Sequence, residues 1–69
     1  MAEFTLRQLR TLAAVHRNGR IISASKELGL TQPAVSLQIK EAEGIAGTAL
    51  FDRTAEGMRP TAAGSAVIE

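Results

Sequence analysis

Four apolar residues and one histidine recur at helical spacing near the start of the chain. The recurring positions are Leu6, Leu9, Leu12, Ala13 and His16, the arrangement of a helix that turns one face inward. Thr5, with Gln8 three residues later, matches a capping box, in which the threonine serves a free backbone N–H. Asn18-Gly19 supplies the stop, since both residue types tolerate a left-handed backbone. The pattern predicts a first helix between these two signals.

Two further helices are predicted on either side of Gly29. The earlier one covers roughly residues 22–28 and can bury Ile21, Ala24, Ser25 and Leu28. Gly29 stands where a helix end favours a residue without Cβ, and Leu30 is expected to enter the core. Thr31 is placed to cap the third helix, and Pro33 suits its first turn, where a missing N–H costs little. The third helix can bury Val35, Ile39, Ala42 and Ile45.

The helical pattern weakens after residue 43. Gly44 and Gly47 destabilise the end of the third helix, so we expect it to stop between them. Leu50-Phe51 and Met58-Arg59 predict two short strands, joined by a polar loop over residues 53–57. Thr61 is a candidate cap for one more helix, over residues 62–68. The predicted fold class is therefore mainly α: three helices, a two-stranded wing and the start of a fourth helix.

Residues 22–43 have the layout of a helix-turn-helix, a short helix and a capped helix joined at a glycine. This geometry leaves the N-terminal turns of the third helix projecting, on a face that shows Gln32, Ser36, Gln38 and Lys40. A glutamine amide can bond adenine at two points, and Pro33 with Ala34 offers apolar surface for thymine methyls. No acid lies between residues 31 and 40, and the positive end of the helix dipole favours phosphate. These residues suit the major groove of DNA.

Spacing alone leaves a structural interpretation open beside the functional one. Helix pairs with a glycine turn are common in small helical domains, where Gln32 and Ser36 are merely solvated surface. Thr31 is expected first as a cap and only then as a DNA contact. Arg53 either fastens its loop to the body of the domain or binds a phosphate.

Composition narrows the function classes. A chain of 69 residues with 45% hydrophobic content suits one small folded domain. With no cysteine and one histidine, neither a disulfide framework nor a metal cluster built on these side chains is expected. No nucleophile–base pair or phosphate loop suggests catalysis, and no apolar run approaches a membrane span. We therefore expect a cytoplasmic protein that is not an enzyme, with no cofactor, metal or membrane partner.

Charge is concentrated at the start of the chain. The net charge is only +1, but residues 1–20 hold four arginines against Glu3, a local balance of +3. The stretches 21–43 and 44–69 each carry −1. A domain this mildly charged grips phosphates weakly by itself, so we expect DNA binding to use a dimer that doubles the contacts.

The order of segments resembles the LysR-type transcriptional regulators over nearly the whole chain. The residues that carry the resemblance are Leu6-Arg7-Gln8-Leu9, Ala24, Leu28, Thr31-Gln32-Pro33-Ala34-Val35-Ser36 and Gln38-Ile39. Two more runs follow at fixed distance, Phe51-Asp52-Arg53-Thr54 and Thr61-Ala62-Ala63-Gly64. Within this resemblance, residues 31–40 look most like regulators of autotrophic carbon-fixation operons.

The resemblance implies a winged helix-turn-helix domain over residues 1–60, with a recognition helix at about 31–43 and a wing at about 52–60. Residues 61–69 then begin a linker helix that pairs two subunits, so the implied partner is an inverted-repeat operator on double-stranded DNA, bound by a homodimer or larger assembly. A small-molecule effector is expected to bind a C-terminal domain that lies outside these residues. The candidate DNA-binding residues are Thr31, Gln32, Pro33, Ala34, Ser36, Gln38, Lys40, Arg53, Thr54 and Arg59.

Some residues depart from the usual pattern of that family. Leu37 stands where a basic side chain is usual, and Glu56 lies in a wing that is usually more basic. Ala42 replaces a core leucine, residues 44–47 form a looser helix end, and Pro60 replaces an apolar residue before the threonine. We expect weaker DNA affinity than a typical member has.

The rival functional hypothesis is a winged-helix module that mediates protein association and never touches bases. A basic surface around Arg7, Arg10 and Lys40 favours DNA. An exposed apolar patch on the third helix favours a protein partner.

Overall fold

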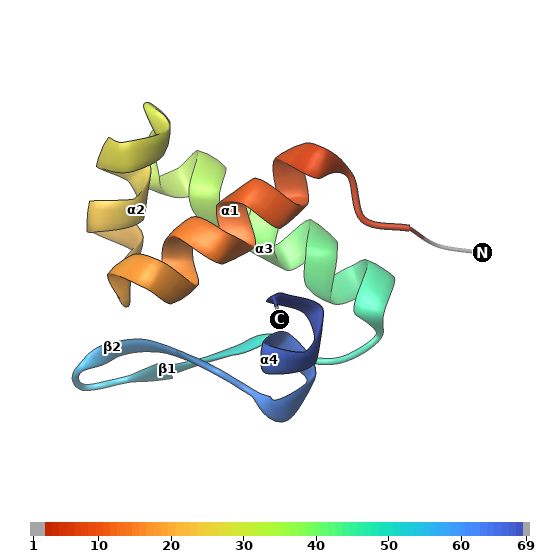
Figure 1. The fold of residues 1–69 in the computed structure, drawn as a ribbon. Helices are drawn as coiled ribbons and strands as arrows, with labels where there is room; N and C mark the ends of the chain where they lie inside the picture. Colours follow the sequence, from red (N-terminus) through yellow and green to blue (C-terminus); the bar gives the residue numbers. More distant parts are fainter. Residues whose placement is uncertain (1–2, 69) are drawn as a thin grey trace.

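The chain folds into short helices divided by glycines, followed by a hairpin. The computed structural model describes residues 3–68. Its elements are α1 (Leu6–Asn18), α2 (Ile21–Leu28), α3 (Gln32–Ala46), β1 (Phe51–Thr54), β2 (Gly57–Pro60) and α4 (Ala62–Ile68). In Figure 1, α1 crosses α3, α2 stands at one end of both, and the β1–β2 hairpin runs below them. The predicted mainly α winged helix-turn-helix is confirmed.

Side chains and glycines close the helix ends, largely as predicted. The Thr5 hydroxyl accepts from the Gln8 backbone N–H at 3.0 Å, and the Gln8 side-chain oxygen accepts from the Thr5 N–H at 2.9 Å. Thr31 caps α3 by accepting from the Ala34 N–H at 3.2 Å. A left-handed glycine ends each of the first three helices: Gly19, Gly29 and Gly47. The start of α2 differs, because Arg20 at its N-cap makes no side-chain capping bond.

The core lies where the first three helices meet the base of the hairpin. Its buried apolar residues are Leu12, Ala14, Val15, Ala24, Val35, Ile39, Ala42, Leu50 and Phe51. The predicted stripe of α3 is therefore confirmed in its first three members, while Ile45 is partly buried. Leu30 is 38% exposed, so the prediction that it enters the core is wrong.

The buried face of α1 differs from the recurring apolar positions. The exposed members of that repeat are Leu6, Leu9 and His16, Ala13 is partly buried, and Leu12 alone is fully buried. The positions that α1 buries are Gln8, Thr11, Leu12, Ala14 and Val15. Gln8 tolerates burial because its side-chain oxygen is already bonded in the capping box. The recurring set and the buried set share only Leu12, and periodicity alone does not say which side of α1 the other helices cover.

The hairpin is longer than predicted. Its strands pair antiparallel from Phe51 opposite Pro60 to Thr54 opposite Gly57, so the expected loop over residues 53–57 shrinks to a turn at residues 55 and 56. Polar side chains gave no strand signal, because a two-stranded sheet leaves much of its surface in water. The Thr54 hydroxyl donates to the Gly57 carbonyl at 2.9 Å and closes the turn.

Hydrogen bonds from backbone N–H groups attach the hairpin to the helices at both of its ends. At the tip, the Met58 N–H donates to the Gly19 carbonyl at 2.8 Å. At the base, the Glu43 carboxylate of α3 accepts from the Leu50 N–H at 2.8 Å. The Leu50 carbonyl in turn accepts from the Thr61 N–H at 3.0 Å, just before α4. The position of the wing relative to α3 is therefore fixed by contacts at two separate points.

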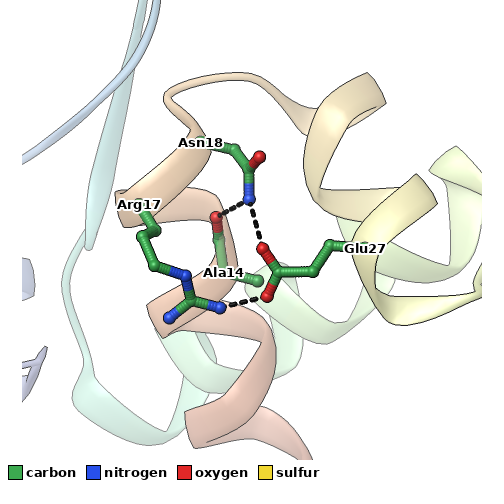
Figure 2. Close-up of polar contacts among 4 residues, drawn as sticks. All are labelled: Ala14, Arg17, Asn18 and Glu27. Carbon is green, nitrogen blue, oxygen red and sulfur yellow. Dashed lines mark hydrogen bonds and ion pairs between the residues drawn. The ribbon is translucent and has the colours of Figure 1, made fainter.

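A polar cluster joins the end of α1 to α2 (Figure 2). The Asn18 amide donates to the Ala14 carbonyl at 2.8 Å and to one Glu27 oxygen at 3.0 Å. The Arg17 guanidinium donates to the other Glu27 oxygen and forms an ion pair with it. The hydrogen bond from Asn18 and then that from Arg17 lower the pKa of Glu27 below its ordinary value.

Two helical glycines should respond in opposite ways to alanine. A Cβ at Gly64 would come closer to the Leu50 carbonyl oxygen than real Cβ atoms do, whereas a Cβ at Gly44 meets nothing within 4 Å. We expect Gly64→Ala to lower the free energy of unfolding by about 1–3 kcal/mol or more, through overpacking. Gly44→Ala should raise it by about 0.5–1 kcal/mol through helix propensity. Denaturant titration measures both, and equal effects of the two changes would contradict the close α4–Leu50 contact.

The Glu27 cluster should make stability depend on pH in the acid range. Because its folded-state pKa is depressed, Glu27 contributes stability above its unfolded pKa, and that contribution disappears as pH falls through the folded pKa. We expect Glu27→Gln to lower the melting temperature at pH 7 and to match the wild type once both are acidified below that range. Glu56→Gln, at the exposed turn of the hairpin, is the control. A deficit of Glu27→Gln that is independent of pH would argue against an ionised Glu27 in this cluster.

Candidate nucleic-acid interface

Helix α3 separates a buried face from an exposed one. Val35, Ile39 and Ala42 point into the core, so the other sides of the helix face away from it. Exposed on its N-terminal turns are Gln32, Pro33, Ser36, Leu37 and Lys40. Ala34 and Gln38 are partly buried. The candidate residues of this helix therefore lie on its outer surface and its two flanks.

One flank of α3 faces the wing. Gln32 shares a hollow of about 270 Å³ with Arg20, Arg53 and Thr54, which we call the wing-side hollow. Farther along the helix, Ser36 and Lys40 share a second hollow of about 260 Å³ with Arg53. Arg53 borders both hollows, so the structure brings together five of the predicted site residues: Gln32, Ser36, Lys40, Arg53 and Thr54.

The two wing arginines lie on opposite faces of the hairpin. Successive side chains of a strand alternate, and directly paired residues share a face. Arg53 pairs with Met58, and both line the hollows beside α3. Arg59 pairs with Asp52 and so points to the other face. The structure therefore groups Arg53 with the recognition helix and leaves Arg59 apart from it.

The opposite flank of α3 faces α1. Ala34 and Gln38 line a groove of about 600 Å³ with Arg7, Arg10 and Thr11. We call this the α1-side groove. Its lining is completed by Leu6, Leu28 and Leu30. The Gln38 Oε1 atom is buried and has no hydrogen-bond partner in the described part of the chain. Sequence reasoning grouped Gln38 with Gln32, but the two side chains lie on different flanks.

Thr31 and Pro33 stand at the start of α3. The Thr31 hydroxyl oxygen accepts the capping bond from Ala34 and remains exposed. Pro33 is exposed in the first turn, beside Gln32. Both predicted residues thus belong to the projecting end of the helix, where free backbone N–H groups and the dipole favour an anionic partner.

The cations around α3 form no ion pairs in the described part of the chain, although Glu43 borders the same hollow as Lys40 and Arg53. Within residues 3–68, the one ion pair closer than 4 Å joins Arg17 to Glu27. In that part of the chain, Arg7, Arg10, Arg20, Lys40 and Arg53 therefore have no carboxylate at ion-pair distance. Sequence reasoning missed Arg20, whose place in the wing-side hollow depends on how the hairpin tip docks on the α1–α2 turn. Unneutralised cations on both flanks give this surface an attraction for anions.

The described residues offer little for other kinds of site. Residues 3–68 contain no group of three potential metal-ligating His, Cys, Asp or Glu side chains. None of their helices has the length and apolar character needed to cross a membrane.

Comparison with protein families identifies one match over most of the chain. The family model described as "Bacterial regulatory helix-turn-helix protein, lysR family" matches residues 6–65. The chain is 56% identical over its full 69 residues to the HTH-type transcriptional regulator CbbR of Rhizobium meliloti (strain 1021). It is 51% identical over 49 residues, 71% of its length, to the HTH-type transcriptional regulator CfxR of Cupriavidus necator. The chain spans 22% of the former relative and 16% of the latter.

Solved structures show the same arrangement. The structure described as a complex of the CbnR DNA-binding domain with DNA superimposes with a TM-score of 0.86 at 36% identity, covering 96% of this chain and 74% of that one. The structure described as CbnR, a LysR family transcriptional regulator, gives a TM-score of 0.87 at 36% identity, covering 96% of this chain and 22% of that chain.

Proposed function

The chain belongs to the LysR family of bacterial regulatory helix-turn-helix proteins, and we propose that it is the sequence-specific DNA-binding part of a transcription regulator. The observation that carries the proposal is the exposed N-terminal half of α3, which is free of acids and has arginines without acidic partners on both flanks. The similarity to a domain solved in complex with DNA supports it.

In this proposal α3 enters the major groove with its N-terminal turns first. Gln32, the more exposed of its two glutamines, can offer its amide to an adenine edge, and Ser36 lies one turn farther along. Arg53 lies beside both on the wing and supplies charge to the neighbouring phosphates. Thr31 and Pro33 bring the helix end close to the backbone, where its dipole is favourable.

The whole regulator is proposed to act as a homodimer or larger assembly on an inverted repeat, since two-fold DNA matches two-fold protein. A small-molecule effector would bind outside these residues. The resemblance of residues 31–40 to carbon-fixation regulators, with 56% identity to CbbR, supports a target operon of that kind. Its place of action is the cytoplasm, and no residue is assigned a catalytic role.

A protein-association module remains the rival function, and Leu37 is the observation that bears on it. Leu37 is 56% exposed on the outer face of α3. Its exposed neighbours on this helix are polar or small: Gln32, Pro33, Ser36, Lys40 and Glu41. On α3 itself, a single leucine among such residues is not the apolar patch that a protein partner would need, so DNA is favoured. The exposed Leu6 and Leu30 lie apart from it, in the lining of the α1-side groove.

The proposal is tested by separating base reading from phosphate binding. On a duplex that the chain selects from a randomised pool, Gln32→Ala should weaken binding by about 1–3 kcal/mol, with little change on random DNA, because the lost amide reads a base. Lys40→Gln is the matched control and should weaken binding on both duplexes alike. Equal losses on both duplexes for Gln32→Ala would contradict base reading by this residue. Failure of the wild-type chain to prefer any sequence would overturn the proposed function.

Leu37 offers a test by gain of function. Its exposed position on the outer face of α3 should let a cation reach a phosphate. We expect Leu37→Arg to strengthen binding and to steepen the dependence of log affinity on log salt by about 0.9. Leu37→Gln, which adds polarity without charge, should leave the salt slope unchanged. An unchanged slope in Leu37→Arg would place residue 37 off the DNA.

A further inference from the structure

The α1-side groove has an apolar part, lined by Leu6, Leu28, Leu30 and Ala34, and a polar part whose long side chains present only hydrogen-bond donors. Arg7 and Arg10 contribute guanidinium groups, and no carboxylate of residues 3–68 lies within ion-pair distance of either. The Oε1 atom of Gln38 is buried, so a ligand that reaches this amide meets Nε2, which can only donate. The acid nearest along α3, Glu41, lines a separate hollow together with Arg7 and Gln38. A groove of about 600 Å³ with this set of donors suits an anion that accepts several hydrogen bonds.

We propose that the α1-side groove binds the phosphodiester backbone of double-stranded DNA through Arg7, Arg10 and Gln38. The inference rests on the proposed function and adds a second backbone contact to it. Gln38 thereby becomes a residue that positions the domain on DNA and does not read a base.

The position of the groove identifies the strand that it contacts. A helix with its side chains is about 10–12 Å across and nearly fills a major groove about 12 Å wide, so phosphates lie on both of its flanks. Arg53 occupies the wing-side flank of α3, whereas Arg7 and Arg10 occupy the α1-side flank. The two sets of arginines would therefore contact the two strands that border one major groove.

The burial of Gln38 Oε1 argues against base reading by this residue. Two-point recognition of adenine needs both the donor and the acceptor of the amide at the base edge. With its oxygen buried beside α1, Gln38 can offer one end of the amide only. Gln32, which is exposed on the other flank, carries no such restriction.

The salt dependence of binding to a random-sequence duplex tests the arginines. Each lost phosphate contact should reduce the slope of log affinity against log salt by about 0.9, for Arg7→Gln and for Arg10→Gln. Between about 50 and 200 mM salt, the affinity of the wild type should therefore fall by a factor about ten times larger than the factor for the double variant. Arg17→Gln is the matched control, because this arginine lies on the same helix but pairs with Glu27; it should leave the slope nearly unchanged. Thermal melts confirm that each variant is folded.

Gln38→Met tests the amide while keeping the length of the side chain. We expect DNA binding to weaken about threefold to tenfold, which corresponds to the loss of one hydrogen bond. The loss should be the same on random and on selected duplexes. A loss confined to the selected duplex would restore Gln38 as a base reader and overturn its assignment to the backbone.

The possible outcomes distinguish a failure of the proposed backbone contact from a failure of the proposed DNA-binding function. If the wild-type chain binds neither duplex at about 50 mM salt, the proposed function fails and the inference fails with it. If the wild type binds while Arg7→Gln and Arg10→Gln keep its slope, only the inference is overturned. The groove would then be free for a partner that carries carboxylates.

Discussion

The wing is held at Leu50, and the candidate interface depends on that attachment. The Leu50 N–H is bonded by the Glu43 carboxylate, its carbonyl accepts from Thr61, and its side chain is fully buried. Gly64 packs so tightly on the same carbonyl that no side chain fits between them. One residue therefore links α3, the hairpin and α4. Arg53 lies only three residues farther along the chain, and its place beside Gln32 follows from this anchor.

Local signals in the sequence were sufficient to predict the helices. Caps at Thr5 and Thr31 and the left-handed glycines after each of the first three helices act within a few residues of one another, so they can be recognised without the fold. The buried face of α1 could not be predicted in that way. Leu6 and Leu9 are apolar but exposed, while Thr11 is buried, because the neighbours that cover one side of α1 are distant in sequence.

In the candidate site too, the sequence predicts what depends on neighbouring residues and not what depends on tertiary packing. The run from Thr31 to Lys40 was predicted as one DNA-facing surface, and its members do lie on the outer side of α3 and its flanks. Which flank each residue occupies depends on tertiary packing. Gln38 lies toward Arg7 and Arg10, whereas Gln32 lies toward Arg53. The sequence pattern predicts a loop at Arg53, where the structure has a strand. A loop has no regular alternation of side chains, so the pattern cannot show that Arg53 and Arg59 lie on opposite faces.

The contact between Gly19 and the hairpin tip limits how this domain can be re-engineered. Gly19 ends α1, and its carbonyl also accepts the Met58 N–H. Gly57 lies so close to that carbonyl that a Cβ there would collide with it, and its backbone is left-handed at φ 130°. The wing therefore cannot be exchanged independently of the helices that it contacts. A chimera that grafts the hairpin of another protein onto these helices would have to carry over a glycine at the tip and keep the α1–α2 turn that receives it.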